Sequence, residues 1–353
     1  MLIDIVLDAV GSDKAPEPEI RGAILACQRL PVRVHLVGPE AELRDLVDEY
    51  MGDEELPIVI HNASERISMD EKAAHAVRTK RDSSMRVGLK LVREGKAAGF
   101  VTGGNTGAAM ATAKMVLGAL PGVDRPALAT PMPSAGPRPC VLLDVGANVD
   151  CKPTNLEQFA LMGEIYVRTV LKIEHPRVGL LSIGEEETKG NELTREAFPL
   201  LKALNLNFIG NVEGRDLFSG FADVIVCDGF VGNVALKTSE GVGRFVRDVL
   251  RESLTQTVTA KVGALLSRQA FNAFRKRLDY REYGGALLLG VRGVCIIGHG
   301  SSNDVAIYNG IRVAYESVKA GTIQHIEQEF AKRAKLEAVQ AEAQPGAIAP
   351  AAS

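Results

Sequence analysis

Short apolar segments alternate with helical segments along most of this chain, and this alternation limits the folds that it can adopt. Nine runs rich in valine, isoleucine and leucine occur at residues 3–7, 32–37, 57–61, 99–102, 140–145, 178–183, 207–210, 223–227 and 294–298. They are nearly all apolar rather than alternating, as a sheet covered on both faces requires. Helical periodicity lies between most of them. The pattern predicts a three-layer α/β/α fold with a mostly parallel sheet.

The length of 353 residues suits either two domains or one large α/β domain. We expect residues 1–338 to form a single large α/β domain, which could be divided into two lobes. We expect the low-complexity residues 339–353 to be a disordered tail. A long helical insertion at about 244–281 carries nine basic and three acidic residues. It is typical of an interfacial helix or a docking groove for an acidic partner, but also of a helix pair that forms a dimer or covers the core.

Glycine is unusually frequent, with 35 residues, and many of these glycines follow the predicted strands. Ligands in open α/β sheets bind beyond the carboxyl ends of strands, where glycine lets the backbone approach a ligand closely. Free N–H groups at the following helix N-terminus favour anions there. We therefore expect one anion-binding crevice built from seven loops, at residues 8–16, 102–108, 142–148, 182–191, 208–217, 227–233 and 297–303.

Several polar residues in these loops are candidates for binding an anion. Asparagine recurs at positions 105, 148, 191, 211, 233 and 303, where its amide suits either a helix cap or a hydrogen bond to phosphate. Lys189 follows three glutamates, and it either forms ion pairs with them or meets a phosphate or a developing oxyanion. His299 lies between two glycines, whereas the other five histidines lie in contexts not typical of catalysis.

Other functional classes are disfavoured by the sequence. It contains no GxxxxGK[ST], GxSxG or HExxH motif, and no GxGxxG follows the first strand. The net charge of -3 gives no reason to expect nucleic acid as a partner. The five cysteines lack metal-ligand spacing and are interpreted as buried thiols of a reducing cytosol. Without a leader or membrane span, the chain is expected to be cytoplasmic, with peripheral membrane contact left open.

With no evident side-chain nucleophile, the pattern suggests direct attack of one bound substrate on another, promoted by positioning and electrostatics. Taken together, the motifs resemble the bacterial acyl-ACP:phosphate acyltransferase family of phospholipid synthesis, the PlsX type. The resemblance spans about residues 3–320. It rests on DAVGSDKAP, SSMRVGLKLVREGKAAGFVTGGNTGA, LLDVGAN, SIGEEETKGN, FIGNVEGRDL, ADVIVCDGFVGNVALKTSEG, EYGGALLLGVRG and IIGHGSSN. Departures from the family pattern are Val10, Ser12, Thr102-Gly103 and Leu287.

The resemblance implies a reversible transfer of a fatty acyl group from acyl carrier protein to inorganic phosphate, with no metal and no cofactor. It implies a fold similar to phosphotransacetylases and isocitrate/isopropylmalate dehydrogenases, and a homodimer. Lys189 and Asn233 match the family's catalytic lysine and amide, with Asn105, Asn148 and His299 as lesser candidates for phosphate or thioester contacts. The acyl phosphate would pass to a membrane acyl-phosphate:glycerol-3-phosphate acyltransferase. This gives Arg275, Lys276 and Arg277 a role in contact with the carrier protein or the inner face of the membrane.

Three alternatives to this function stay open at the level of sequence. A phosphotransacetylase acting on a short acyl-CoA shares the fold and the nucleophile. A decarboxylating dehydrogenase needs clustered aspartates for a metal and a nicotinamide site, and the sequence shows neither pattern. A non-enzymatic peripheral membrane scaffold would use the basic helices alone and leave the seven glycine loops unexplained.

Overall fold

One sheet of eleven strands runs through the structure, a computed structural model that describes residues 1–271, 274 and 284–343. The strand order is β3-β2-β1-β4-β11-β10-β5-β6-β9-β7-β8, and seven of the ten neighbouring pairs are parallel. The strands are β1 (Ile3–Asp8), β2 (Val32–Gly38), β3 (Ile58–Asn62), β4 (Gly99–Thr102), β5 (Ala127–Met132), β6 (Cys140–Leu143), β7 (Arg177–Leu181), β8 (Asn207–Val212), β9 (Val224–Val226), β10 (Ala286–Leu289) and β11 (Val294–Ile297).

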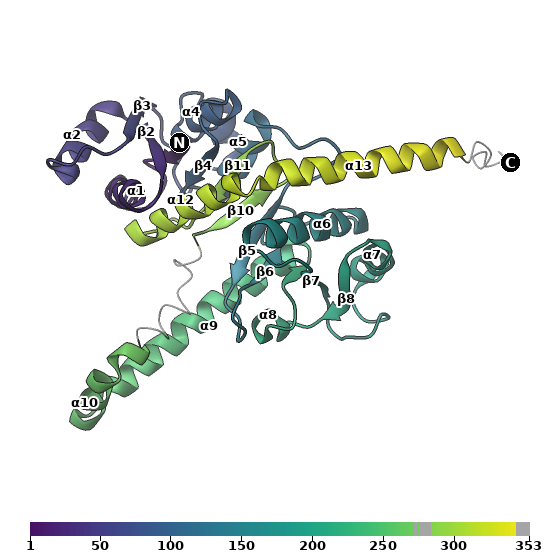
Figure 1. Ribbon diagram of the computed structural model, residues 1–353. Coiled ribbons are helices and arrows are strands. Elements are labelled where there is room, and N and C mark those ends of the chain that lie inside the picture. Colours follow the sequence, from purple (N-terminus) through teal and green to yellow (C-terminus); the bar gives the residue numbers. More distant parts are fainter. Residues whose placement is uncertain (272–273, 275–283, 344–353) are drawn as a thin grey trace.

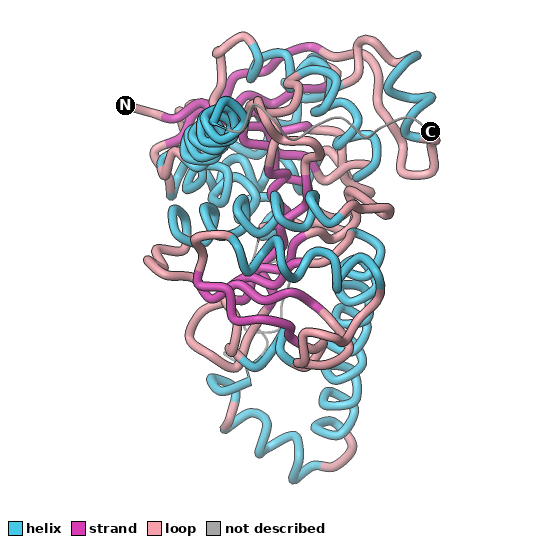
Figure 2. The backbone as a smooth tube through the Cα atoms, turned by 90° about the vertical axis from the view of Figure 1, so that its right-hand side faces the viewer, coloured by secondary structure: helices cyan, strands magenta, loops and turns pink. Residues whose placement is uncertain are grey.

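Helices cover both faces of this sheet (Figures 1 and 2). One apolar core packs against α1 (Glu17–Arg29), α2 (Glu40–Met51), α6 (Pro153–Val170), α7 (Glu192–Ala203), α12 (Asp304–Lys319) and α13 (Thr322–Ala343). The other packs against α3 (Ala73–Thr79), α4 (Ser84–Arg93), α5 (Thr106–Val116), α8 (Asp216–Ser219) and the start of α9 (Gly229–Thr255). Successive strand residues alternate between the cores: Ile5 and Leu7 face the first, and Val6 faces the second. The predicted three-layer fold is confirmed.

The sheet has two halves that run in opposite directions. Strands β3-β2-β1-β4-β11 are mutually parallel, and so are β6-β9-β7-β8. Three consecutive antiparallel pairings through β10 and β5 reverse the direction between these halves. The seven glycine loops, which were predicted to build one anion-binding crevice, are therefore divided between the two halves of the sheet. Three of them follow β1, β4 and β11, and four follow β6, β7, β8 and β9.

Two strands were absent from the sequence prediction, β5 and β10, and both lie at this reversal. Strand β5 contains alanines and Pro131, which are depleted in strands, and β10 has only four residues between glycines. Each pairs antiparallel with its neighbours, so neither shows the strand-helix alternation on which the prediction relied.

The predicted basic helical insertion begins earlier than expected. Helix α9 runs for 27 residues, and α10 (Val258–Leu266) follows after a break at which Thr257 caps its first turn. Both helices project from the body of the molecule (Figure 1). At the other end of the chain, α13 continues to Ala343, so the first five residues of the expected disordered tail are helical. Gln340, Ala341, Glu342 and Ala343 favour helix; residues 344–353 lie outside the described residues.

Candidate active site

A cavity of about 860 Å³ lies beside the direction reversal of the sheet. One wall is β5, from which Leu128, Thr130, Pro131 and Met132 line the cavity. Leu128, Thr130 and Met132 are alternate residues and lie on one face of the strand. Another wall is α9, and the lining also includes the carboxyl end of β11 with Gly298 and His299. Most of the lining side chains are apolar, which suits a ligand with a long hydrocarbon part.

Helix α9 contributes a line of polar side chains to this cavity. Asn233, Lys237, Glu240, Arg244 and Arg247 all line it, and their spacing of four, three, four and three residues places them on one helix face. Sequence analysis singled out Asn233 and gave Arg244 and Arg247 only as parts of a basic segment. It missed Lys237 and Glu240, although this spacing beyond the glycine loop is the signal that could have revealed them.

Asn233 is held at the start of α9 by the loop that follows β6. The carboxylate of Asp228 caps the helix and accepts hydrogen bonds from the N–H groups of Phe230 (3.0 Å) and Val231 (2.9 Å). Asn233 Nδ2 donates to the carbonyl oxygen of Val145 at 3.2 Å, and the residue is otherwise exposed. An amide nitrogen carries two hydrogens, so one remains for a ligand.

The loop that follows β6 packs closely against α9, and this packing depends on glycine at position 232 of the helix. A Cβ atom there would lie 1.9 Å from the carbonyl oxygen of Asp144, so no other residue fits without displacing the loop. Asp144 itself is fully buried, and its carboxylate accepts from the backbone N–H groups of Leu128, Ala147 and Asn148 and from Asn148 Nδ2. Burial raises the pKa of Asp144, and these donors oppose the rise.

Asn148 does not line the cavity. It is buried, and its Nδ2 donates to the carbonyl oxygen of Pro126 at 2.8 Å and to Asp144 Oδ2 at 3.0 Å. Both hydrogens of the amide are therefore used inside the protein. In this geometry Asn148 fixes the loop that in turn holds Asn233.

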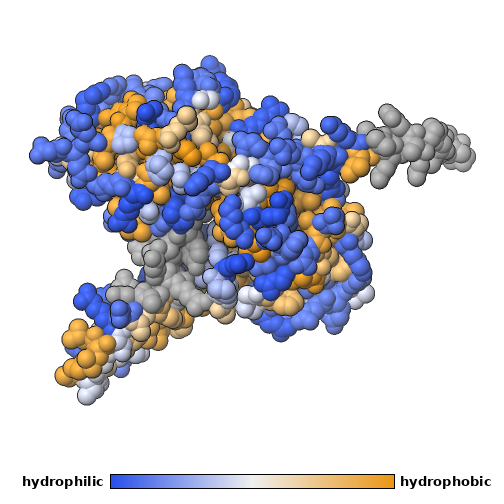
Figure 3. Space-filling view, viewed as in Figure 1, coloured by the Kyte–Doolittle hydropathy of each residue, from blue (hydrophilic) through white to orange (hydrophobic). Residues whose placement is uncertain are grey.

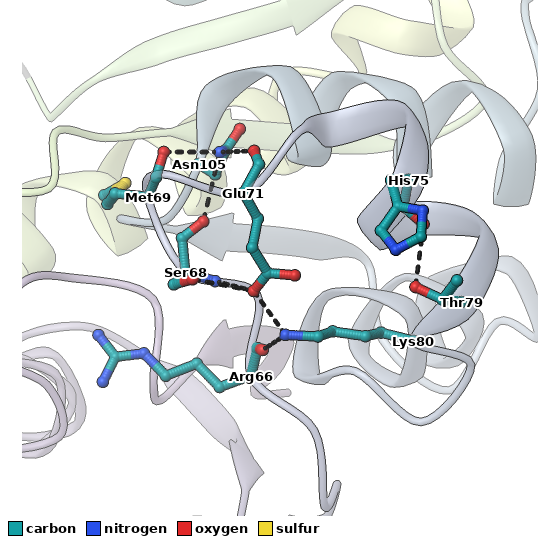
Figure 4. A network of polar contacts seen from close by, with 8 residues as sticks. All are labelled: Arg66, Ser68, Met69, Glu71, His75, Thr79, Lys80 and Asn105. Atoms are coloured by element: carbon teal, nitrogen blue, oxygen red, sulfur yellow. Dashed lines mark hydrogen bonds and ion pairs between the residues drawn. The ribbon is translucent and has the colours of Figure 1, made fainter.

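The amide nitrogen of Asn105 donates to backbone carbonyl oxygens of the segment from Ser68 to Glu71, as Figure 4 shows. Its Oδ1 accepts from Ala108 N at 3.0 Å and caps α5, while Nδ2 donates to the carbonyl oxygens of Met69 (3.0 Å) and Glu71 (3.1 Å). Asn191 and Asn303 likewise cap α7 and α12. For these three residues the structure favours the helix-cap interpretation; Thr106, next to Asn105, lines the cavity.

Lys189 lies in the loop that follows β7. Because β7 and β9 pair in parallel, with Leu180 beside Val226, this loop lies next to the loop that leads into α9. Lys189 is exposed, does not line the cavity, and its ammonium makes no ion pair or hydrogen bond within the described part of the chain. The three preceding glutamates are therefore not its partners: Glu185 pairs with Arg215, and Glu187 pairs with Lys202.

A buried amide on β8 holds the Lys189 loop in place. The carbonyl oxygen of Glu186 accepts from Lys189 N at 3.0 Å and from Asn211 Nδ2 at 2.8 Å. Asn211 is only 5% exposed, so its contact ties the loop directly to the sheet. Gly190 next to Lys189 has φ +109°, a conformation that favours glycine.

His299 meets α9 across the cavity. Its Nε2 lies 3.3 Å from Glu240 Oε1, and Lys237 Nζ lies 3.1 Å from Glu240 Oε2. The Glu240 side chain is 10% exposed. Burial opposes its ionisation, but hydrogen bonds and charge from His299 and Lys237 outweigh burial and lower its pKa to about 2.

The proposed contact residues Arg275, Lys276 and Arg277 lie outside the described residues. Among residues 1–271, 274 and 284–343, no three His, Cys, Asp or Glu side chains are grouped so that they could hold a metal ion. In the same part of the chain, every helix is too short or too polar to cross a membrane.

Comparison with known proteins decides the family. A family described as "Fatty acid synthesis protein" matches residues 3–325. A phosphate acyltransferase of Acidobacterium capsulatum is 72% identical over 331 residues, which cover 94% of this chain and 98% of that protein. A phosphate acyltransferase of Koribacter versatilis is 65% identical and covers 94% of each chain. This chain belongs to the phosphate acyltransferase family.

The phosphate acyltransferase family membership confirms the resemblance inferred from the motifs and makes the chain an acyltransferase of fatty acid and phospholipid synthesis. Solved structures confirm the fold. A phosphotransacetylase from Streptococcus pyogenes aligns with TM-score 0.60 at 18% identity, over 90% of this chain and 94% of that chain. A 4-hydroxythreonine-4-phosphate dehydrogenase from Klebsiella pneumoniae aligns with TM-score 0.52 at 14% identity, over 90% and 100% of the two chains.

Proposed function

We propose that this phosphate acyltransferase moves a fatty acyl group from the thioester of acyl carrier protein to inorganic phosphate, giving acyl phosphate and free carrier protein. The observation that carries the proposal is the cavity of about 860 Å³, which combines apolar walls with the polar face of α9. The apolar walls suit a fatty acyl chain. Amide and cationic groups suit phosphate and the thioester carbonyl.

Two residues are proposed to act on the reacting groups. Lys189 would reach in from its loop beside the loop that leads into α9, outside the cavity lining, to neutralise phosphate or the developing oxyanion. Asn233 would donate its remaining N–H to the acyl carbonyl. The position of Asn233 on the cavity wall supports its role. The role of Lys189 is supported because Glu185 and Glu187 pair with other residues and do not neutralise the Lys189 ammonium. Because phosphate is already anionic at neutral pH, charge stabilisation and alignment are the main requirements.

The lesser candidates separate into two proposed roles. His299 lines the cavity and is kept as a contact for phosphate or the thioester. Asn105 and Asn148 hold loops through amides that already have protein partners, and we propose that they act on the site only through those loops.

The projecting helices α9 and α10 are proposed to meet the carrier protein or the membrane. Their end carries exposed Val262, Leu265 and Leu266, visible as the apolar tip in Figure 3, and basic residues lie along the same segment. Acidic partners and anionic lipid are both attracted to such a segment. We therefore propose a cytoplasmic enzyme that docks peripherally on the membrane, where a membrane acyl-phosphate:glycerol-3-phosphate acyltransferase takes its product.

Charge reversal at Arg275, Lys276 and Arg277 separates these docking partners. We expect the triple glutamate variant to weaken binding of acyl carrier protein, flotation with anionic vesicles, or both, while leaving the unfolding temperature unchanged. Unchanged binding to both partners would remove these residues from the docking surface.

The acyl donor is tested by measuring phosphate-dependent thiol release. We expect turnover with a long-chain acyl carrier protein and little with acetyl-CoA, because a two-carbon group leaves most of the apolar wall without contact. Turnover with acetyl-CoA and none with acyl carrier protein would favour the phosphotransacetylase alternative. Absence of turnover with either donor would favour the scaffold.

A further inference from the structure

A concentration of positive charge covers α3, α4 and the loop between them. Residues 72–93 contain seven basic side chains and one acidic side chain, although the net charge of the whole chain is -3. On α4, Arg86, Lys90 and Arg93 are spaced by four and three residues and therefore share one face of the helix. Four apolar side chains of the same helix are buried in the core: Met85, Leu89, Leu91 and Val92. The basic face of α4 is thus turned away from the core.

The end of α3 and the loop after it bring further cations to this face. Arg86 Nη1 lies 3.5 Å from the carbonyl oxygen of Val77, which is next to Arg78. Arg78 and Arg81 are exposed. We define the α3–α4 basic surface by five residues: Arg78, Arg81, Arg86, Lys90 and Arg93. Within the described part of the chain, none of the five forms an ion pair with a carboxylate, so their charge is available to a partner.

This surface lies close to the cavity. Asn105 Nδ2 donates to the carbonyl oxygen of Met69, just before α3, and the next residue, Thr106, lines the cavity. A Cβ atom on Gly107 would lie 3.2 Å from Ala73 Cβ, so α3 and α5 begin side by side. Helices α4 and α5 also pack against each other (Figure 1). A partner bound to the α3–α4 basic surface is therefore near the edge of the cavity that Thr106 forms.

We propose that the α3–α4 basic surface docks the acidic acyl carrier protein, and that the projecting helices α9 and α10 are left to contact the membrane. The inference rests on the function proposed above. Opposite charges on two proteins speed their association and fix the orientation in which they dock. A carrier protein held here has its acyl thioester beside the cavity.

A lipid surface fits this region less well than an acidic protein does. An interfacial helix inserts apolar side chains into the lipid. Between residues 70 and 114, all of which the structure describes, no large apolar side chain is exposed. The tip of α10 does expose such side chains, with Leu265 69% and Leu266 82% exposed, and it lies at the other end of the molecule from α4 (Figure 1). The carrier protein and the membrane are therefore assigned to separate surfaces.

The test compares two donors that carry the same long acyl chain. One is acyl carrier protein, and the other is the N-acetylcysteamine thioester, which is small and uncharged. For the double variant Lys90→Glu, Arg93→Glu we expect kcat/KM with acyl carrier protein to fall about tenfold, through KM, at low ionic strength. We expect kcat/KM with the small thioester and flotation with anionic vesicles to stay unchanged. Direct binding of labelled acyl carrier protein should weaken by the same factor.

The matched control is Lys332→Glu, Lys335→Glu, which reverses two exposed charges at the same spacing on α13 and is expected to leave both donors unaffected. Unchanged kcat/KM with acyl carrier protein in the α4 variant, or equal losses with both donors, would overturn the proposal. Loss of flotation with full carrier protein turnover would place lipid on this surface instead. If the α4 variant fails to fold, Lys90→Gln, Arg93→Gln decides by the same donor ratio. Failure of the wild-type enzyme to acylate phosphate from either donor would overturn the proposed function.

Discussion

Among single residues, Lys189 offers the sharpest test of the proposed chemistry. We expect Lys189→Ala to lower kcat for acyl phosphate formation at least about 100-fold, the scale of losing an oxyanion donor. The matched control is Lys202→Ala, which removes an exposed ion pair with Glu187 in the same region. Such pairs contribute about 1 kcal/mol or less, so this control is expected to retain its activity. Near-normal turnover in a folded Lys189→Ala enzyme would exclude the role.

The buried carboxyl group of Glu19 should make the free energy of unfolding depend on pH. It is fully buried on α1, with Oε1 accepting from Ser12 N at 2.9 Å and Oε2 without a hydrogen-bond partner among the residues that the structure describes. Burial raises its pKa from 4.5 to about 7. Between these values the unfolded chain releases a proton that the folded chain keeps. The free energy of unfolding should therefore fall by about 3 kcal/mol as pH rises through this window.

Urea unfolding at pH 5 and pH 8 measures this effect. Glu19→Gln is expected to reduce the loss of stability between the two pH values, while Glu17→Gln on the exposed side of the same helix is not. Part of the decline should remain, because burial also raises the pKa of Asp8. Equal pH dependence in wild type and Glu19→Gln would contradict the assignment.

Residue types and their loops were predictable from the sequence, but side-chain partners were not. Asparagine after a strand indicated a polar loop for Asn105, Asn148 and Asn233 alike. What separates them is whether the amide is used within the protein, and that depends on backbone far away in the sequence, such as Met69 for Asn105. Such long-range contacts leave no local pattern in one sequence.

Among the elements, α9 depends most on a single packing contact. Gly232→Ala is expected to lower the free energy of unfolding by about 3 kcal/mol and to reduce activity, because its Cβ would lie 1.9 Å from the carbonyl oxygen of Asp144. Gly241→Ala on the same helix is the control: no atom lies near its added Cβ, and alanine favours helix by about 1 kcal/mol. Thermal unfolding of the two variants should therefore shift in opposite directions. A shared direction would contradict this packing account.

The elements also show why most of the sheet was predictable and its direction reversal was not. Apolar runs followed by helices identified nine strands, because each βα unit carries a local signal. Strands β5 and β10 pair antiparallel with their neighbours and therefore lack that signal. In addition, β5 contains two alanines and a proline, and β10 is only four residues long. Together they separate the two groups of glycine loops, and β5 supplies a wall of the cavity.

For the whole molecule, the projecting helices predict self-association. Phe245 and Val249 on α9, away from the apolar tip assigned above to the carrier protein or the membrane, are 68% and 44% exposed in a single chain. We expect light scattering to give twice the chain mass of 37.7 kDa at micromolar concentration. Replacing Phe245 with glutamate is expected to shift the mass toward one chain, because the apolar contact is lost. A monomeric wild-type enzyme would contradict the homodimer.

Direct attack of phosphate on the bound thioester in the cavity beside α9 leaves no covalent acyl-enzyme. Incubation of the enzyme with radiolabelled phosphate and a long-chain acyl carrier protein measures this most directly. We predict one labelled acyl phosphate for every carrier thiol released, and no acyl group retained on the protein when phosphate is omitted. Thiol release without label in the acyl product, or a stable acyl-enzyme formed without phosphate, would contradict the account.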